Sequence, residues 1–475
     1  MRKSCGPILL NSHPSCPFYT KKNKIRLATA KKGGGKSALL RWIEISLRES
    51  SEDYVVILCK GRDLVRTNFS LSGQPSTPNE YINDWISRIC CVVARQLGKE
   101  LGIALDDDAI SLVEAAELAG EKKRNLISAV VDRMKGVTGS IERKRLEVAN
   151  YEELLVRVLK KKVWFLVDDL DATYQRTDRE NLELSTFFSA CRYLSTTLSE
   201  ICFRVTMRTD VWTMLRRYDE SLDKVDQYVS DITWSQSEFR KLLFKRIAAQ
   251  VHDLKIQLPP KPEYVTEEEE QEYYVDLVFE KRMKWGESEK RTYKVIYTLA
   301  YHRPRWAIQL CKSAQVEAIA EKSDVIQREH IDEVWAGYGK KRIADLVSEH
   351  KHQCRTIEEL ISAFRGAERR MNRDKLLDWI KNTISNHMTP VIEGVPTKVP
   401  LEIAHFLFRI GFIVARAEEG KDDYEHYHFS DMPDFLSSRT NQDFGAIWEI
   451  HPCYREALDI VKLNRWQKKH RNQSR

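Results

Sequence analysis

The sequence has little of several features that would place it in a special class of protein. Its 475 residues include ten cysteines, but none are in a C-x-x-C spacing, so neither a zinc ribbon nor a disulfide framework is indicated. No apolar run approaches the length of a membrane span, and residues 1–17 have no uninterrupted apolar core. We therefore expect a cytoplasmic protein with reduced thiols, no secretion signal and no membrane contact.

Acidic residues are absent from the first 43 positions, and none follows Asp459 near the other end. The net charge of +7 is too small to indicate a nucleic-acid-binding protein, but both ends of the chain are basic. Basic ends favour polyanions, so DNA is one candidate partner. A frayed, solubilising terminus is the other interpretation of the C-terminal tail.

A glycine-rich segment lies between a predicted strand and a predicted helix. The strand covers residues 25–28, and an amphipathic helix is expected to begin near Ser37. Glycines let backbone N–H groups surround phosphate oxygens, and the first turn of a helix directs further N–H groups at the same anion. We expect Lys36 to reach the β- and γ-phosphates of a nucleotide and Ser37 to bind Mg²⁺. The residues predicted to contact the nucleotide here are Ala30, Lys31, Lys32, Gly33, Gly34, Gly35, Lys36, Ser37 and Ala38.

The segment follows the G-x-x-x-x-G-K-[ST] pattern with one departure, because Ala30 replaces the first glycine. An alanine adopts fewer backbone angles but keeps its N–H group, so we expect the loop to work. The alternative is a basic glycine turn that binds nothing, which the flanking strand and helix make the weaker interpretation.

Paired acids follow a second apolar run at residues 163–167. A core strand that ends in carboxylates delivers them to the carboxyl edge of a parallel sheet, where ligands of such sheets bind. We expect Asp168 to hold Mg²⁺ through water and Asp169 to polarise the attacking water. Many hydrolytic relatives have glutamate at the second position, and the shorter aspartate predicts slow turnover. Asp171 is interpreted first as a helix cap, and otherwise as a supporting group or a base.

Arginines that could sense the nucleotide occur at two later places. Arg208 follows a third strand at 201–207, where it would contact the γ-phosphate, or alternatively pair with an acid such as Asp210. Arg303 and Arg305 flank Pro304 at the start of an apolar helix, and one of them would reach a nucleotide from a lid. The alternative for this pair is a set of surface arginines.

After residue 356 the sequence has a different pattern of predicted helices and strands. Helices are predicted at 357–365 and 373–384, and a third helix in the run 399–414 ends at a glycine. A polar turn at 418–423 and the segment 424–429 complete a two-stranded hairpin. This is the winged-helix pattern, and such domains bind DNA in some proteins and only proteins in others.

We therefore predict an α/β fold, with a P-loop NTPase parallel sheet and flanking helices, a helical lid and a C-terminal winged-helix domain. The expected boundaries are an ATPase core at 1–250 with a helical insertion at about 100–160, the lid at 251–350, and the winged helix with its basic tail at 351–475.

The order of these motifs resembles the STAND and origin-recognition-like branch of the AAA+-related P-loop ATPases, especially bacterial members carried in antiviral-defence and mobile-element loci. Arg208 is similar to the sensor position of these families and Arg305 to their lid motif, although His302 and Arg303 are placed where they often have glycine. The positions that match the families' nucleotide and metal residues are Gly33, Gly34, Gly35, Lys36, Ser37, Asp168 and Asp169. The resemblance implies an ATP-driven conformational switch, often in a homo-oligomer.

The leading hypothesis is an ATP-binding, slowly hydrolysing switch with Mg²⁺, in which Lys36, Asp169 and Arg208 are catalytic. It would be the ATPase component of a bacterial antiviral defence system, acting with a partner or effector chain because no effector block is evident in the sequence. Adenine is the expected base, since no N-K-x-D motif follows a suitable strand. The second hypothesis is a DNA-binding initiator or regulator in which ATP licenses the winged helix. A degenerate ATPase serving as a scaffold is the third.

Overall fold

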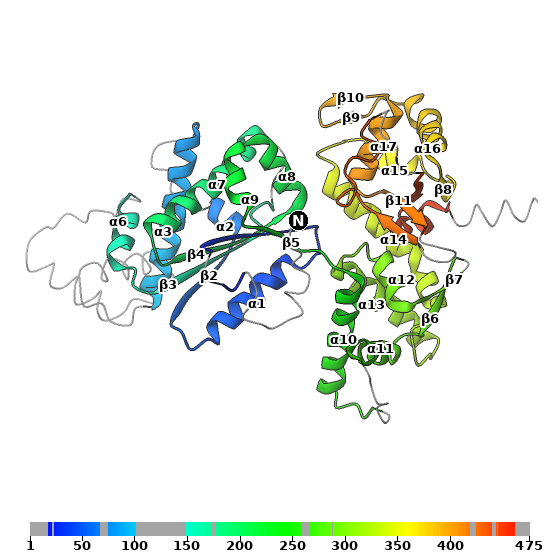
Figure 1. Ribbon diagram of the computed structural model, residues 1–475, viewed down its shortest axis with the longest axis horizontal. Coiled ribbons are helices and arrows are strands. Elements are labelled where there is room, and N and C mark those ends of the chain that lie inside the picture. The colour runs from blue at the N-terminus through cyan, green and yellow to red at the C-terminus, as the bar shows by residue number, and fades with distance from the viewer. Residues whose placement is uncertain are drawn as a thin grey trace, which may run out of the picture. The chain divides into compact units, whose positions relative to one another are not determined.

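The computed structural model describes residues 18–20, 23–66, 75–100, 149–172, 174, 177–258, 266–286, 288–418, 424–438, 443 and 445–460. The chain divides into two compact units, Met1–Trp234 and Ser235–Arg475, which are described separately (Figure 1). Most of the expected helical insertion and the basic tail after residue 460 lie outside the described residues.

The first unit is built on a five-stranded parallel sheet with strand order β2-β3-β4-β1-β5. The strands are β1 (Ile25–Ala30), β2 (Tyr54–Lys60), β3 (Lys162–Asp168), β4 (Ile201–Arg208) and β5 (Val229–Asp231). The first four contain the apolar runs of the sequence, as expected for strands that are buried on both faces. Because β4 pairs with both β1 and β3, it separates the strand before the glycine-rich loop from the strand that carries the acids.

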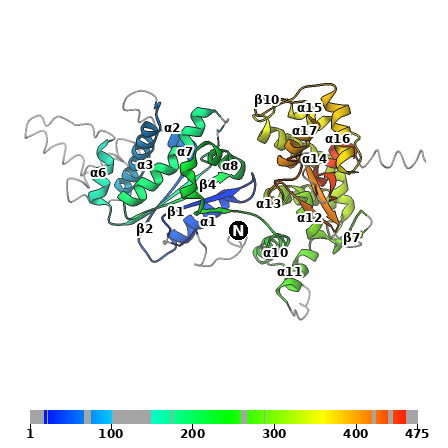
Figure 2. The same ribbon diagram turned by 45° about the horizontal axis from the view of Figure 1, so that its top comes forward.

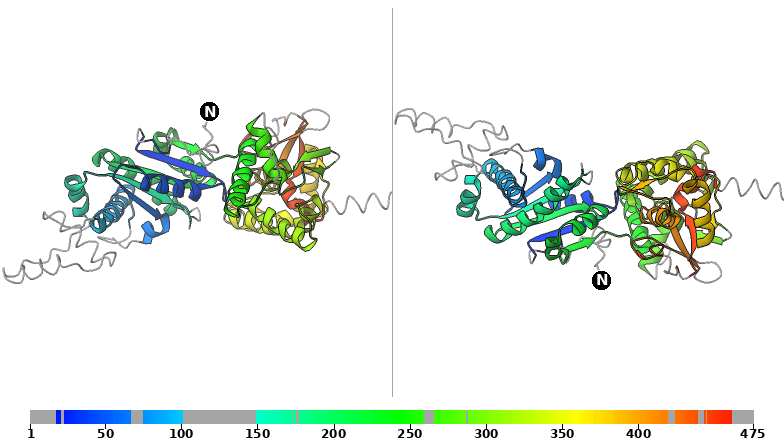
Figure 3. Two further views of the ribbon diagram at one scale, coloured as in Figure 1. Left: turned by 90° about the horizontal axis from the view of Figure 1, so that it is seen from below. Right: turned by 90° about the horizontal axis from the view of Figure 1, so that it is seen from above.

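Helices cover both faces of this sheet, as Figures 1 and 2 show. One face packs against α1 (Lys36–Arg48), whose Leu39 and Ile43 share a core with Trp164. The neighbouring strand residues Val163 and Phe165 point to the opposite core, in agreement with the two-residue period of a strand. That second core is covered by α3 (Pro78–Glu100), α6 (Ala149–Val158), α7 (Asp178–Thr197) and α8 (Thr209–Tyr218). The views from below and above in Figure 3 show the same two layers. Shorter helices are α2 (Gly61–Arg66), η2 (Glu220–Leu222) and α9 (Asp223–Asp226).

A buried arginine fastens the segment before β1 to the sheet. Arg204 of β4 is 0% exposed, and its guanidinium donates to the backbone carbonyls of Phe18 (2.5 Å) and Thr20 (2.8 Å). The same group stacks over the Trp164 ring at 4.6 Å. The sequence interpretation did not anticipate this cation, because Arg204 interrupts an otherwise apolar strand without any local signal.

The second unit begins with a set of helices. Its first helix is α10, which the sequence analysis placed in the ATPase core; Phe239 and Leu243 of this helix instead pack with the core of the second unit. The boundary between compact units therefore follows Trp234 and does not lie near residue 250. From the sequence, either Ser235 or Ser237 is expected to cap α10; in the structure Ser235 caps it through its side chain. The elements of this part are α10 (Gln236–Asp253), α11 (Glu267–Asp276), β6 (Arg282–Trp285), β7 (Ser288–Arg291), α12 (Thr292–Leu299), α13 (Pro304–Ala320) and α14 (Arg328–His350).

The rest of the second unit has the predicted order of three helices and two strands. Gly411 ends the third helix with a φ of 79°, a backbone angle that favours glycine. The four-stranded sheet has the order β12-β11-β13-β8, and β13 is an addition that the winged-helix pattern did not include. The elements are α15 (Ile357–Ser362), β8 (Arg370–Met371), α16 (Arg373–Ile380), a π-helical turn (Lys381–Ser385), β9 (Val391–Ile392), β10 (Val395–Pro396), α17 (Pro400–Arg409), β11 (Ile413–Glu418), β12 (Tyr424–Tyr427), β13 (Ile447–Ile450), α18 (Pro452–Arg455) and η4 (Glu456–Leu458).

The expected boundary at residue 350 does not separate two cores. A single hydrophobic cluster runs from α10 to the end of the described chain. The Trp335 indole of α14 donates to the Pro452 carbonyl at 3.2 Å, and a Cβ on Gly339 would lie 2.9 Å from the Cys453 carbonyl oxygen. Because α14 packs this closely on α18, the helical and winged-helix regions form one unit. None of the helices within the described ranges is long and apolar enough to cross a membrane.

Candidate functional site

At each glycine of the loop between β1 and α1, either the backbone angle or the available space favours glycine over other residues. Gly33 and Gly35 have φ angles of 81° and 110°, which L side chains rarely adopt. Gly34 is required by space, because a Cβ there would be 3.0 Å from the Ala30 Cβ and 3.0 Å from the Lys31 carbonyl oxygen. The methyl group of Ala30 therefore lies next to the space that Gly34 leaves open, which explains how an alanine is tolerated at the first position of the pattern.

The helix after the loop begins without a side-chain cap. Gly35 is the N-cap of α1, and no side chain bonds to the first turn. By contrast, α7, α10 and α11 begin with capping boxes built on Thr177, Ser235 and Thr266. The first-turn N–H groups of α1 and the positive end of its dipole are thus left for another anion.

Lys36 is a buried cation with few partners. Its side chain belongs to a residue that is 8% exposed, and its ammonium donates to the Ala30 carbonyl at 3.3 Å. This is its single hydrogen bond within the described part of the chain, although an ammonium has three donors, and it makes no ion pair there. Burial lowers the pKa of Lys36, while the carboxylates of Asp171 and Asp169 act in the opposite direction. The glycine-rich loop with Lys36 and the end of β3 are far apart in the sequence, but their charges are close enough in space to interact.

The two acids at the end of β3 have different environments. Asp168 is 8% exposed and accepts a hydrogen bond from the Thr206 hydroxyl at 2.7 Å. Asp169 is exposed and has a φ of 52°, a left-handed angle that is strained for a side chain other than glycine. Partial desolvation and the neighbouring Asp168 raise the pKa of Asp169, and Lys36 opposes them. Asp169 is thus held at the sheet edge as a carboxylate with a raised pKa.

A glycine of the neighbouring strand supports this turn. A Cβ on Gly61 would lie 2.2 Å from the Leu170 Cα and 2.9 Å from the Asp169 carbonyl oxygen. The backbone after β2 therefore presses directly on the backbone that follows the paired acids. Sequence reasoning missed Gly61, since its importance depends on a contact between segments more than 100 residues apart.

Arg208 lies at the end of β4, as predicted, and pairs with a buried acid. Its Nε donates to the Asp171 carboxylate at 2.6 Å, and its backbone N–H donates to the same oxygen at 3.2 Å. The partner is Asp171, which is 3% exposed, and not Asp210 as the alternative interpretation proposed. Of the three roles considered for Asp171, the structure shows the supporting group behind Arg208. The charge of Arg208 contributes to lowering the pKa of Lys36, so both cations act on the same edge.

Two further side chains form hydrogen bonds at this edge of the sheet, and neither was predicted from the sequence. The buried Trp234 indole donates to the Gly34 carbonyl at 2.8 Å, so the last residue of the first unit holds the glycine-rich loop. The Asp231 carboxylate at the end of β5 accepts from the hydroxyls of Thr29 (2.7 Å) and Thr209 (3.0 Å). The available signal was a polar residue inside a buried strand, as at Thr29.

The remaining predicted residues of the loop are on the surface. Lys31, Lys32, Ser37 and Ala38 are exposed. The Ser37 hydroxyl makes no hydrogen bond with a described residue, so its oxygen is available to a cation. Within the described ranges no group of three or more His, Cys, Asp or Glu side chains is arranged to hold a metal. A Mg²⁺ ion that arrives with phosphates needs only one or two protein ligands, and the hydroxyl and carboxylate oxygens here fit that requirement.

The arginines of the second unit differ from each other. Arg303 is buried, donates to both carboxylate oxygens of Glu349 (2.9 and 3.3 Å) and stacks over the Trp306 ring at 4.1 Å. It is therefore neither a surface arginine nor available to a nucleotide. Arg305 is exposed on the first turn of α13 and stays the candidate lid residue.

The third winged-helix helix offers little basic surface. Within α17, Ile403, Phe406 and Phe408 are among the buried residues, and Glu402 is exposed. Its Arg409 pairs with Glu393 at 2.8 Å. A helix that enters a DNA groove needs exposed donors along one face, which α17 does not present.

The parallel sheet, the glycine-rich loop at the start of α1 and the acids at the end of β3 define the fold of the first unit as that of a P-loop NTPase. A family model described as the FunZ-associated C-terminal helical domain matches residues 237–347, within the second unit. A search of curated proteins gave no match.

Three solved structures are similar to this chain over most of their length. The chain is similar to the Aeropyrum pernix ORC2 protein in ADPNP–ADP complexes, at 11% identity, with 98% of this chain and 93% of that chain covered and a TM-score of 0.41. It is also similar to the Aeropyrum pernix ORC1 protein in complex with DNA (12%, 96% and 91%, TM-score 0.36). The third is CDC6P from Pyrobaculum aerophilum (12%, 98% and 91%, TM-score 0.34). These scores are low, and the fold assignment rests on the sheet and the loop.

Proposed function

We propose that this protein binds ATP with Mg²⁺ and hydrolyses it slowly, as a conformational switch. The observation that carries the proposal is the Lys36 ammonium, which is buried beside an uncapped helix and uses one of its three donors within the described residues. Leaving a cation in this state is costly unless an anion completes its shell. A triphosphate supplies that anion at the place where the loop and the helix direct their N–H groups.

The other residues of the edge take roles that suit phosphoryl transfer. Lys36 and Arg208 would balance charge that develops on the phosphates, and Asp169 would polarise the attacking water. Ser37 and Asp168 would hold Mg²⁺, which draws electron density from the phosphate oxygens. Aspartate reaches less far than glutamate, so we expect a low turnover number. The nucleotide-binding role of Arg305 stays a prediction from the sequence.

Two substitutions test this proposal. Lys36→Ala is expected to abolish ATP binding, because the phosphates lose their buried cation, whereas Asp169→Asn is expected to keep binding and lose hydrolysis. Binding is measured with labelled ATP and hydrolysis by release of phosphate. Lys224→Ala, at an exposed lysine of the same unit, is the matched control. Equal ATP binding by the wild type and Lys36→Ala would refute the assignment of the site.

We further propose that the switch belongs to a bacterial antiviral defence system and acts with a partner or effector chain, in a homo-oligomer. The support is the resemblance to defence-associated ATPases. Purification with and without ATP tests it: a partner or a larger oligomer is expected in one nucleotide state and not in the other. The same monomer in both states would contradict this part.

The second candidate is an ATP-licensed DNA-binding protein, favoured by the winged-helix order and the basic ends of the sequence. The buried character of α17 weighs against it. A salt titration separates the candidates, because phosphate-tracking DNA binding weakens with a slope of about 0.9 per neutralised phosphate. Loss of binding on deletion of residues 461–475 would support the basic tail as the contact.

A further inference from the structure

A polar cavity lies within the second unit, and Ser235 and His302 are among the residues that line it. Its volume is about 460 Å³, within the range of small-molecule sites. It lies among β6, α12 and β12, close to the start of α10. Basic side chains dominate its lining, against the single acid Glu425: Lys290, Lys294, His302 and His426.

The ammonium group of one of the two lysines has no hydrogen-bond or ion-pair partner among the described residues. The Lys294 ammonium is half-buried and makes no hydrogen bond or ion pair with a described residue. Lys290 lies over the Tyr424 ring, with its ammonium 5.4 Å from the ring centre. Two ammonium groups thus line one wall of the cavity, and an anion is the ligand that they favour.

Rigid aromatic side chains form another part of the wall. Tyr424 accepts a hydrogen bond from the Trp285 indole at 2.6 Å, and the Arg416 guanidinium lies 3.5 Å from the Tyr424 ring centre. Trp285 in turn stacks on Trp335, with ring centres 5.7 Å apart and planes at 14°. These contacts cover faces of the Tyr424 and Trp285 rings, so this part of the wall fixes the shape of the cavity.

The backbone is strained where it places His302 in the cavity. Tyr301 and His302 have φ angles of 52° and 58°, which favour glycine, and His302 stands where the resembled families often have that residue. The His302 imidazole stacks on Tyr297 with ring centres 4.0 Å apart and planes at 10°. These angles end helix α12, where the His302 N–H donates to the Tyr297 carbonyl at 3.2 Å, and the turn brings the imidazole to the cavity lining.

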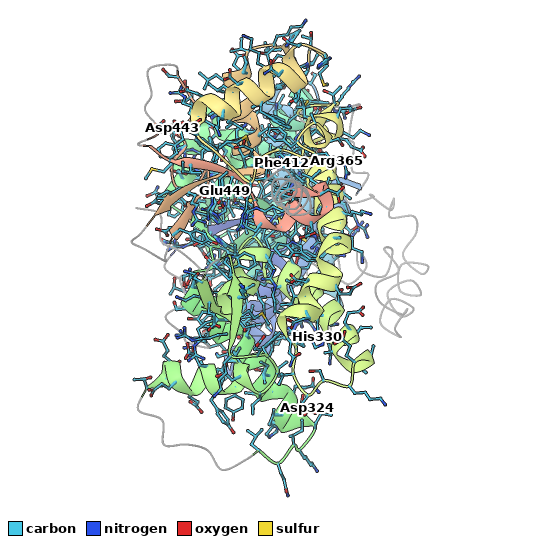
Figure 4. All side chains as sticks on the ribbon, turned by 90° about the vertical axis from the view of Figure 1, so that its right-hand side faces the viewer. Asp324, His330, Arg365, Phe412, Asp443 and Glu449 are labelled. Atoms are coloured by element: carbon cyan, nitrogen blue, oxygen red, sulfur yellow. The ribbon has the colours of Figure 1, made fainter. Side chains whose placement is uncertain are left out.

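The charge behind the cavity is also positive. Glu449, labelled in Figure 4, is 1% exposed and bonds to Arg455 at 2.7 Å and to Arg370 at 2.8 Å. His426 contacts the same carboxylate at 3.0 Å and extends from it to the cavity lining. Burial and the Arg455 guanidinium lower the pKa of the nearby Arg369 to about 10. Burial lowers the pKa of His426, so this imidazole favours its neutral form, and the excess positive charge around Glu449 comes from the guanidinium groups.

We propose that this cavity is a second ligand site, which binds the phosphate group of a ligand through Lys290, Lys294 and His302. The chemistry is shared by a free nucleotide and by the terminal nucleotide of a single strand. All residues that line the cavity belong to the second unit, and one of them, Ser235, directly follows Trp234 in the chain.

Binding by the full chain carrying Lys36→Ala tests the proposal, since this change removes the first site. The probes are labelled AMP, ADP and ATP in one arm, and a 5′-phosphorylated hexanucleotide of single-stranded DNA in the other. We expect saturable binding of one probe, weakened about tenfold or more by Lys290→Ala combined with Lys294→Ala. Lys312→Ala, at an exposed lysine of α13, is the matched control and should bind like its parent.

His302→Gly gives a second readout that does not depend on the lysines. Glycine removes the left-handed strain and the imidazole together, so binding should fall while the melting temperature stays near that of the parent. Binding only of the hexanucleotide would assign the source to a nucleic-acid end. No binding of any probe to the Lys36→Ala chain, or binding unchanged by the two lysine substitutions, would overturn the proposal, and neither result bears on ATP binding at Lys36.

Discussion

Buried charges are treated in opposite ways in the two units. In the second unit, Arg303 and Glu349 form a bidentate pair, and Glu449 is surrounded by guanidinium groups, so these charges bond within the protein. In the first unit, Lys36 is as well buried but keeps most of its donors unused within the described residues. When a buried charge is paired within the protein, removal of one partner destabilises the fold. A buried charge that lacks a partner in the protein indicates a ligand.

The largest expected effect is on the stability of the second unit. Glu449→Gln should lower the free energy of unfolding by about 3–5 kcal/mol, because it leaves buried guanidinium groups without their counter-charge. Denaturant unfolding of the full chain measures this change. Glu425→Gln, at an exposed acid of β12 in the same sheet, is the control. A decrease in the unfolding free energy below about 1 kcal/mol would mean that Glu449 contributes no more than a surface ion pair. That result would contradict the contrast between the buried charges of the two units.

The same residue predicts a pH dependence. Burial opposes ionisation of Glu449, but Arg455, His426 and Arg416 hold its pKa well below the ordinary value of 4.5. Because the folded pKa lies below the unfolded one, the stabilisation is complete above pH 4.5 and is lost as the pH falls through the folded pKa. The difference in unfolding free energy between the wild type and Glu449→Gln should therefore narrow as the pH is lowered from 7 to 3. A constant difference would contradict this origin of the stability.

A smaller effect concerns the fit between Ala30 and Gly34. Gly34→Ala should weaken ATP binding about tenfold or more, because the new Cβ would meet the Ala30 Cβ and the Lys31 carbonyl, each at 3.0 Å. The double change Ala30→Gly with Gly34→Ala should recover part of the loss, since one of the two close contacts disappears. Ala30→Gly by itself is the control and should bind normally. An additive double mutant would show that the two positions do not share this space.

The smallest expected effect is the most direct test of the comparison. Lys36→Met replaces a buried, poorly bonded cation by an apolar chain of similar length, so the melting temperature without nucleotide should stay the same or rise. Calorimetry of the nucleotide-free protein measures it. A destabilisation as large as that expected for Glu449→Gln would make Lys36 a structural charge and remove the main support for the proposed site.

Local patterns carried most of what the sequence predicted. The strand before the loop, the strand that ends in Asp168 and the strand that ends in Arg208 were all recognised, because each is an apolar run followed by polar residues. The winged-helix order was recognised for the same reason, and Gly411 was correctly placed as its helix stop. The functional roles given to the site residues are not tested by the fold and stay predictions.

Contacts between distant segments were not predictable in this way. Gly61, Thr206 and Trp234 support the site through neighbours that are far away in the sequence, and each is an ordinary residue in its own local context. The strand β13 was missed because its short apolar run, next to Pro452, looks like the start of a helix. Pairing across a sheet depends on partners that a single sequence does not reveal.

Trp234 gives the protein an optical reporter of its own loop. Its indole holds the Gly34 carbonyl, and the peptide bond that follows it leads into Ser235, the cap of α10. Any rearrangement of Gly34 around phosphate must therefore change the surroundings of this fluorophore, at the residue where the polypeptide leaves the sheet. The emission of the wild type minus that of Trp234→Phe would follow the loop in real time, without an attached dye.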